Sequence, residues 1–379
     1  RVEFIDASYL LGMGTFDTEE AIREFFRDDQ IRSATIGPAG ENGVRFANVT
    51  NDGRQAGRTG HGAVWGSKKL KALSVRGTKG VDVYDPEKLM QLSFNITEAS
   101  QGPHTSKYRI LGTATNVLNM NNLGLLPTRN YQEGVFEDAE LVSGEYLDEH
   151  HKVKVIACAQ CPIACEQMSI VRTGPYKGAM TGIEYECLFA NGPNCGINDM
   201  RAIIKMIETC DQGGMDAMSN GVTVSWTMES FERGVLTKED FKCAKYPEGF
   251  EPYFGNGDAG VTLTEMIRDR EGIGKLLSEG TRVASKAIDE ERGTESYKWA
   301  MNIKGLENPG YDARGLKTFS VGLAVGTRGG CHNRTAAYDP DIKGRVDRFS
   351  VDETRGKLAA RTEEYAAVYD TLPLCKFIR

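Results

Sequence analysis

Three cysteines, Cys158, Cys161 and Cys165, stand close together near the middle of the chain. Crowding unpaired thiols brings an intracellular chain little benefit, so this spacing indicates that the three side chains bind one metal centre. Zinc usually takes two separated Cys or His pairs, whereas a compact C-x2-C-x3-C triplet with a remote fourth cysteine is typical of a [4Fe–4S] cluster. Five cysteines remain as alternatives for the fourth ligand: Cys187, Cys195, Cys210, Cys243 and Cys375.

Two other segments share a sequence pattern: Asp211-Gln-Gly-Gly-Met-Asp216 and Asp370-Thr-Leu-Pro-Leu-Cys375. Each has an Asp, a two-residue gap, a Gly or Pro, an apolar residue and then Asp or Cys. A carboxylate there could accept paired hydrogen bonds from a flat N–C–N edge such as that of a pterin. The alternative for each segment taken alone is a helix end followed by a turn.

A glycine-rich segment and a histidine complete the set of candidates. Between Arg54 and Lys71, glycines allow a ligand close to the backbone, and Arg58 with the lysines could bind phosphate, although the spacing is not that of a P-loop. A turn between strands is the alternative. His332 lies between two arginines, just after paired glycines, where a reactive group is plausible, although a lone histidine is more often structural.

Composition narrows the class of protein. The 379 residues carry 46 Lys and Arg against 53 Asp and Glu, a formal charge of −7, which argues against a nucleic-acid surface. No apolar run approaches the ~18 residues that would span a membrane. The nine cysteines are an odd number and unevenly spaced, and no signal segment begins the chain, which favours the cytoplasm.

The elements that must position these residues change in character along the chain. A capping box at Asp17–Glu20 predicts a helix start, and short β-type runs at 34–36, 44–49 and 72–75 predict strands. From about Asp85 the apolar spacing becomes helical, over 86–92, 199–210 and 263–287, with a break near 299–310. The length suggests two or three domains.

Taken together, these motifs resemble the aldehyde:ferredoxin oxidoreductase family of tungsten enzymes. The residues that carry the resemblance are Gly37-Pro-Ala-Gly-Glu-Asn42, Ala56-Gly-Arg-Thr-Gly60, Gly66-Ser-Lys68, the cysteine triplet, Gly182-Ile-Glu184-Tyr-Glu186, Gly192-Pro-Asn-Cys-Gly196, the Asp211 segment, Lys304-Gly-Leu-Glu307, Arg328-Gly-Gly-Cys-His332 and Leu374-Cys375-Lys-Phe377. The order matches over essentially the whole chain. Two departures, Pro373 and Ile183, fall in the second pterin segment and the pocket wall.

The resemblance implies a tungsten, or molybdenum, held by two molybdopterins beside one [4Fe–4S] cluster. The implied cluster ligands are Cys158, Cys161, Cys165 and Cys375. The implied pterin contacts are Arg58, Gly60, Asp211, Gly214, Asp216, Asp370, Leu374 and Cys375, with Mg²⁺ bridging the pterin phosphates. Glu184 matches the family's general base and His332 its hydrogen-bond donor, with Glu186 as the alternative base.

The resemblance also implies an α+β multidomain fold. We expect residues 1–84 to be the end of a β-rich first domain, 85–300 a helical second domain and 301–379 part of a helical third, within a longer protein. The implied activity is oxidation of a small aldehyde to its acid, with electrons passed to ferredoxin or an iron–sulfur subunit, in a homo- or hetero-oligomer. The alternatives are a tungsten-dependent reductase of an aromatic acyl-coenzyme A, a non-catalytic iron–sulfur module and a zinc protein.

Overall fold

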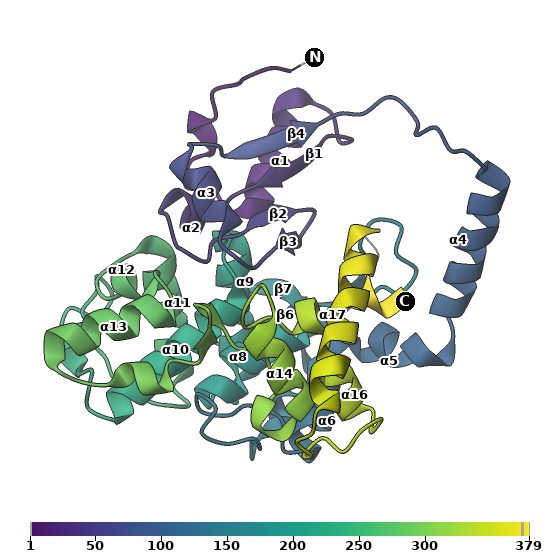
Figure 1. Ribbon diagram of the computed structural model, residues 1–379. Coiled ribbons are helices and arrows are strands. Elements are labelled where there is room, and N and C mark those ends of the chain that lie inside the picture. The colour runs from purple at the N-terminus through teal and green to yellow at the C-terminus, as the bar shows by residue number, and fades with distance from the viewer. Residues whose placement is uncertain (1, 373–374, 379) are drawn as a thin grey trace.

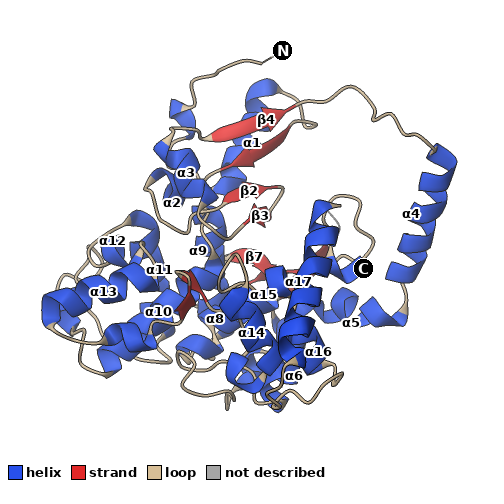
Figure 2. Ribbon diagram, viewed as in Figure 1, coloured by secondary structure: helices blue, strands red, loops and turns tan. Residues whose placement is uncertain are grey.

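The computed structural model describes residues 2–372 and 375–378 and combines α and β structure (Figures 1 and 2). A unit with a small antiparallel sheet comes first, and mainly helical structure follows, which confirms the predicted α+β class. Most buried apolar side chains belong to one large core, and a second, small core lies under the first sheet.

The first sheet has the strand order β3-β2-β1-β4. Its strands are β1 (Arg32–Thr35), β2 (Val49–Asn51), β3 (Arg54–Ala56) and β4 (Ala72–Val75), and the short helices α2 (Pro38–Glu41) and α3 (His61–Ser67) connect them. The predicted strands at 34–36 and 72–75 lie at β1 and β4. The one predicted at 44–49 is wrong over most of its length, because residues 44–47 form a turn with buried apolar side chains.

Helix α1 (Thr15–Phe26) begins two residues before the predicted capping box. Its N-cap is Gly14, no side chain caps it, and Asp17 lies inside its first turn. A Cβ at Gly14 would lie 2.2 Å from the side chain of Gln212, so close packing against another helix places the start at a glycine. The predicted capping box is therefore wrong.

An extended linker at residues 76–85 leads to α4 (Pro86–Ser100), which stands apart from the rest of the molecule (Figure 1). The helix begins where the sequence predicted, and the side chain of Asp85 caps it by accepting from the Lys88 N–H at 2.9 Å. Helix α5 (Pro103–Leu111) then returns the chain to the body of the molecule.

A second antiparallel sheet, not predicted from the sequence, lies inside the helical part. It consists of β5 (Lys152–Ile156), β6 (Glu166–Ile170) and β7 (Met180–Ile183), in that order. The connection between β5 and β6, residues 157–165, carries the three clustered cysteines, and we call it the cysteine loop.

Helices form the rest of the body. They are α6 (Asn116–Asn122), α7 (Gly144–His150), α8 (Tyr185–Asn191), α9 (Met200–Gly213), α10 (Ala217–Glu232), α11 (Gly257–Asp269), α12 (Gly274–Leu277), α13 (Thr281–Arg292), α14 (Lys317–Val325), α15 (His332–Thr335), α16 (Tyr338–Ile342) and α17 (Thr354–Thr371), with the hairpin β8 (Asn302–Ile303) and β9 (Leu306–Glu307). The 3-10 helices are η1 (Ser8–Leu10), η2 (Gly112–Thr115), η3 (Ala139–Val142), η4 (Pro193–Cys195), η5 (Lys238–Phe241), η6 (Ser296–Trp299), η7 (Ala313–Gly315) and η8 (Lys376–Ile378).

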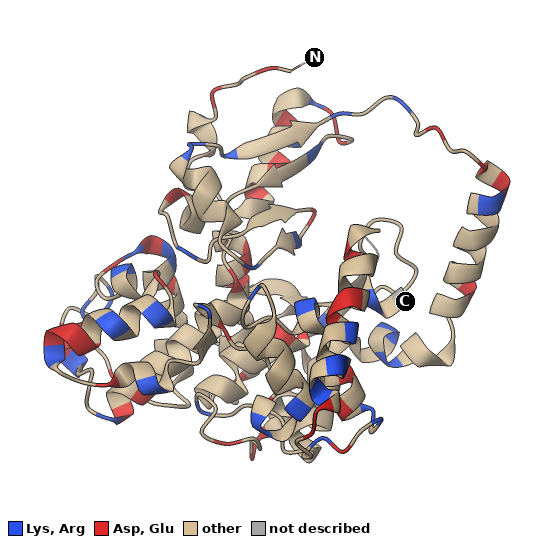
Figure 3. Ribbon diagram, in the orientation of Figure 1, with Lys and Arg blue, Asp and Glu red and all other residues tan. Residues whose placement is uncertain are grey.

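The predicted helix at 263–287 is divided among α11, α12 and α13. Arg270 and Gly280 have φ angles of 55° and 81°, which end regular helix at those points. Charged residues of both signs are interspersed over the ribbon (Figure 3). Among the described residues, no helix combines the length and apolar character needed to cross a membrane.

Candidate functional site

The cysteine loop carries three of the four predicted cluster ligands on one short connection. Gln160 and Ala164 have φ angles of 57° and 54°, so the loop turns sharply twice between β5 and β6. Cys158 is exposed, and Cys161 and Cys165 are half-buried. Burial raises the pKa of Cys165 to about 12, and the charges of Glu184, Cys375 and Cys158 act in the same direction.

The fourth predicted ligand, Cys375, lies near this loop although more than 200 residues separate them along the chain. Burial raises the pKa of Cys375, and the charges of Cys161 and Cys158 add to the rise. Of the other four alternatives, Cys195 donates to the carbonyl oxygens of Ala190 and Gly221 in the core. The structure thus groups Cys375 with the triplet.

Arg54 connects the cysteine loop to a carboxylate. From β3, its Nε lies 3.0 Å from Cys158 Sγ and its Nη1 lies 2.9 Å from Glu184 Oε1 and 3.3 Å from Glu166 Oε2. Burial alone would lower the pKa of this guanidinium, but Glu184 and Glu166 outweigh it and the pKa is raised. Arg54 was not among the predicted site residues, although it opens the glycine-rich segment.

Glu184 and Glu186 lie at the start of α8 but point to different surroundings. Glu184 is the N-cap, in extended conformation, with a 43% exposed side chain directed at Arg54. Glu186 belongs to the first turn, with a 13% exposed side chain directed at His332. Residues two apart on a helix do not share a face, so the side chains of Glu184 and Glu186 point in different directions.

Glu186 and His332 form the most enclosed acid–base pair near the predicted site, and we call it the carboxyl–imidazole pair. Glu186 Oε1 lies 3.2 Å from His332 Nδ1, and Glu186 Oε2 accepts from the Gly310 N–H at 2.8 Å. Burial raises the pKa of Glu186 to about 7. Burial, with the positive charges of Lys376 and Arg58, holds the pKa of His332 well below its ordinary value.

Aromatic rings enclose this pair. Tyr311 stacks on Tyr338 with ring centroids 4.7 Å apart, and the ring of His332 lies 5.6 Å and 6.0 Å from theirs. The hydroxyl of Tyr185 donates to the carbonyl of Gly310, whose N–H binds Glu186. The walls exclude water from the carboxyl–imidazole pair, which strengthens electrostatic interactions within it.

The first Asp segment joins two helices. Helix α9 ends at Gly213, Gly214 follows with a φ of 68°, and Asp216 caps α10 by accepting from the Met218 N–H. The turn that was the alternative reading is therefore present. Asp211 accepts from Gln55 and Thr181 through its two oxygens, and burial raises its pKa to about 7.

Arg58 and Asp216 pair with each other. Arg58 Nε lies 3.0 Å from Asp216 Oδ2, and the guanidinium also donates to the carbonyls of Gly330 and Glu307 at 2.6 Å and 2.8 Å. Both side chains are buried. Arg58 thus holds the backbone just before His332, while Gly60, at φ 79°, approaches the Arg45 carbonyl too closely for a Cβ.

The second Asp segment is described only in part. Asp370 is exposed near the end of α17, whereas Asp211 is half-buried and accepts two hydrogen bonds. Leu374, and the departure at Pro373, lie outside the described residues. The two segments therefore differ in exposure despite their similar sequences.

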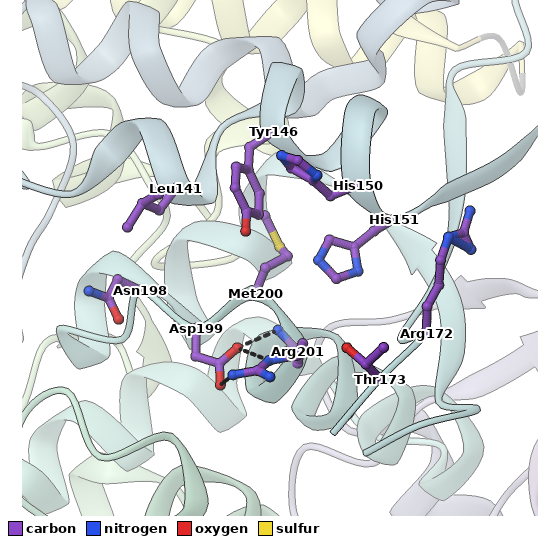
Figure 4. Close-up of a pocket in the computed structure, with 10 residues that line it drawn as sticks. All are labelled: Leu141, Tyr146, His150, His151, Arg172, Thr173, Asn198, Asp199, Met200 and Arg201. Atoms are coloured by element: carbon purple, nitrogen blue, oxygen red, sulfur yellow. Dashed lines mark hydrogen bonds and ion pairs between the residues drawn. The ribbon is translucent and has the colours of Figure 1, made fainter. Parts of the chain in front are cut away.

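A cavity of about 720 Å³ lies elsewhere, between α7 and the start of α9 (Figure 4). Its lining comprises Leu141, Tyr146, His150, His151, Arg172, Thr173, Asn198, Asp199, Met200 and Arg201. Asp199 and Arg201 pair with one another there, and none of the predicted site residues contributes to the lining. A second cavity, of about 120 Å³, is bounded by Tyr131, Pro309 and Tyr311, beside the carboxyl–imidazole pair.

The residues present fit the implied cofactors in their chemistry. Three thiols on one loop, with Cys375 close enough to influence the pKa of Cys165, suit an iron–sulfur cluster. Glu186 Oε1 and His332 Nδ1 are buried without a hydrogen bond. In residues 2–372 and 375–378, no three His, Cys, Asp or Glu side chains are close enough to hold a single metal ion.

The chain matches two models of one family. Residues 1–77 match the N-terminal domain of aldehyde ferredoxin oxidoreductase, and residues 91–379 match its domains 2 and 3. The chain therefore belongs to the aldehyde ferredoxin oxidoreductase family, a family of oxidoreductase enzymes, as the sequence motifs indicated.

Two relatives of the chain carry names that state different activities. The chain is 38% identical to a tungsten-containing aldehyde ferredoxin oxidoreductase of Pyrococcus abyssi, over 100% of this chain and 61% of that protein. It is 32% identical to an aliphatic sulfonate oxidoreductase, WOR-like subunit, of Pyrococcus furiosus, over 100% of this chain and 59% of that protein. The chain thus spans about three-fifths of the length of these relatives.

One solved structure is also similar. The active-site complex BamBC of benzoyl coenzyme A reductase, in complex with 1,5-dienoyl-CoA, aligns with a TM-score of 0.67 and 25% identity. The alignment covers 82% of this chain and 47% of the other.

Proposed function

We propose that the full protein oxidises a small aldehyde to its carboxylic acid at a tungsten, or molybdenum, held by two molybdopterins. The observation that carries the proposal is the contact between Glu186 and His332, two groups suited to proton transfer and carbonyl polarisation. The 38% identity to a tungsten-containing aldehyde ferredoxin oxidoreductase supports it. The bound metal would supply the two-electron acceptor that the chain's own side chains lack.

In this proposal Glu186, rather than Glu184, is the proton acceptor. Its pKa of about 7 leaves a useful fraction ionised at neutral pH, and it lies beside His332, whereas Glu184 is engaged by Arg54. Sequence reasoning favoured Glu184 and kept Glu186 as the alternative. Glu184 and Arg54 instead belong to the surroundings of the cysteine loop.

The carboxyl–imidazole pair can pass a proton between the imidazole of His332 and the carboxylate of Glu186. The low pKa of His332 makes its imidazole neutral, so that only one ring nitrogen carries a hydrogen. While Glu186 is ionised, Nδ1–H can face it. When Nε2 takes a proton from the reacting group, Nδ1–H can pass its own proton to Glu186, so the ring stays neutral. Protonated Glu186 then donates to Nδ1, and Nε2–H can donate to the substrate oxygen.

Electrons would leave through a [4Fe–4S] cluster bound by Cys158, Cys161, Cys165 and Cys375, to ferredoxin or an iron–sulfur subunit in the cytoplasm. Two exposed ligands, Cys158 and Cys375, would bring the cluster close to the surface of this part of the protein. The proposed pterin contacts are Asp211, Gly214, Asp216, Asp370 and Leu374, with Arg58 and Gly60 near the Mg²⁺-bridged phosphates.

The test is elemental analysis of the anaerobically purified full-length protein, followed by an aldehyde screen with a dye acceptor. About four irons with one tungsten or molybdenum per chain, and turnover of an aldehyde, would support the proposal. Iron without tungsten or molybdenum, after expression with both metals supplied, would favour a non-catalytic electron-transfer module. Zinc alone would overturn the cluster.

The likeness to benzoyl coenzyme A reductase favours one other candidate, reduction of an aromatic acyl-coenzyme A. The same preparation separates the two candidates. Reduction of benzoyl-coenzyme A by a low-potential donor, with no aldehyde oxidised, would replace the first proposal by the second.

A further inference from the structure

We propose that Lys376 is a positioning residue for the proposed reaction, whose ammonium, held by Asn333 and Tyr338, keeps the Glu186 carboxylate ionised inside its aromatic enclosure. The inference rests on the proposed role of Glu186 as proton acceptor. It adds a residue from the far end of the chain to a pair formed by α8 and α15.

The position of the ammonium is fixed by two hydrogen bonds. Lys376 Nζ lies 2.7 Å from Asn333 Oδ1 and 3.2 Å from the hydroxyl oxygen of Tyr338. It also lies 5.7 Å from the centre of the Tyr338 ring and 5.5 Å from that of Phe377, favourable positions for a cation. Among the described residues, no carboxylate forms an ion pair with Lys376. The hydrogen-bond partners of its ammonium, Asn333 and Tyr338, are both neutral.

The residues that hold Lys376 adjoin the carboxyl–imidazole pair, and one of them, Tyr338, belongs to its aromatic enclosure. Asn333 follows His332 in α15, and Tyr338 stacks on Tyr311, which contacts the imidazole. The ring of Phe377, next to Lys376, stacks on Tyr108 of α5 with centroids 4.3 Å apart. The 3-10 helix η8 is therefore anchored at two neighbouring residues, through the ring of Phe377 and the ammonium of Lys376.

The charge of Lys376 acts on both members of the pair. It lowers the pKa of Glu186 against the larger rise caused by burial, and after burial it is the largest influence that lowers the pKa of His332. The other charged or titratable groups that influence Glu186, His332 or the tyrosines around them are Arg58, Asp216, Glu307, Asp312, Tyr108, Tyr131, Tyr185, Tyr311 and Tyr338. Of these, only Arg58 is a second cation, and Asp216 partners it.

The test follows the protonation of Glu186 directly, by infrared titration of its carboxyl C=O band in the full-length, metal-loaded enzyme. The band is identified by its loss in Glu186→Gln. We expect Lys376→Met to raise the apparent pKa of this band by about one unit or more, since a unit charge is removed from a poorly screened site. Lys376→Arg should stay close to wild type. Lys357→Met, on the exposed face of α17, removes the same charge at a distance and serves as the control.

A titration of Lys376→Met that coincides with that of Lys357→Met would overturn the inference. Tyr338→Phe retains the charge but removes one hydrogen bond, so a smaller rise is expected; it replaces Lys376→Met if that variant fails to fold. A structural role alone would lower turnover without moving the titration. If wild type oxidises no aldehyde and the band still shifts, the proposed function falls while the electrostatic role of Lys376 stands.

Discussion

The cysteine loop and the carboxyl–imidazole pair meet at residues 375 and 376, yet they differ sharply in exposure and charge. The loop has an exposed thiol at Cys158 and is joined to a 43% exposed carboxylate through Arg54. The pair has side chains only 13% and 7% exposed, enclosed by aromatic rings. An exposed, charged region therefore adjoins an enclosed acid–base pair, and the different surroundings of Glu184 and Glu186 come from packing, since the residue type is the same.

The largest expected effect is the loss of the iron–sulfur cluster when a cysteine ligand is replaced. Cys375→Ala should lose the cluster or convert it to a three-iron form, because the remote thiol completes the ligand set. Iron analysis and electron paramagnetic resonance of the full-length protein provide the measurement. Cys243→Ala, away from the loop, should keep its iron. An unchanged spectrum in Cys375→Ala would exclude this cysteine as a ligand.

Next in size is the loss of the buried carboxylate. Glu186→Gln should reduce kcat by about 10²- to 10⁴-fold, the contribution typical of a positioned base, with iron and tungsten content unchanged. Glu184→Gln is the matched change on the exposed side and should cost much less. If Glu184→Gln proves the more damaging of the two, the assignment of the base returns to Glu184.

The ion pair of Arg58 and Asp216, beside the carboxyl–imidazole pair, tests whether enclosure also makes a charge pair important for the free energy of unfolding. Arg58→Met should destabilise the protein by about 3–5 kcal/mol, because Asp216 would stay buried without its partner. The carbonyl of Gly330, just before His332, and the carbonyl of Glu307 would each also lose a hydrogen bond. Chemical denaturation compares this variant with Arg45→Met, whose exposed pair with Glu279 should contribute little. Equal losses in the two variants would contradict the structural role of Arg58.

The smallest effect is on the pH dependence of stability. The pKa of Glu186 in the folded protein, about 7, is above its unfolded value, so its contribution is fully present below about pH 4.5 and is lost as pH rises through 7. Glu186→Gln should therefore flatten the decline in melting temperature between about pH 5 and 8. Equal slopes in Glu186→Gln and wild type would contradict the raised pKa of Glu186.

Several elements could be predicted because local chemistry determines them. Asp85 followed by Pro86 starts α4, and Asp199 caps α9, where the side chains themselves supply the hydrogen bonds. The start of α1 at Gly14 depends instead on contact with Gln212, nearly 200 residues away. Strands β5 to β7 pair through loops that the sequence does not identify. Each strand is too short for its alternation of apolar and polar residues to be distinguished from the helical pattern around it.

The sequence by itself determined which residues are candidates for the chemistry: the cysteine triplet, Glu184 with Glu186 as the alternative, His332 and Cys375. Their types and order were sufficient to indicate the family. Only the tertiary structure decided that Glu186 faces His332 while Glu184 faces Arg54, and that Arg58 is paired with Asp216. The physical reason is that a helix start turns neighbouring side chains to different faces, and partners far along the chain then set each one's solvation and charge.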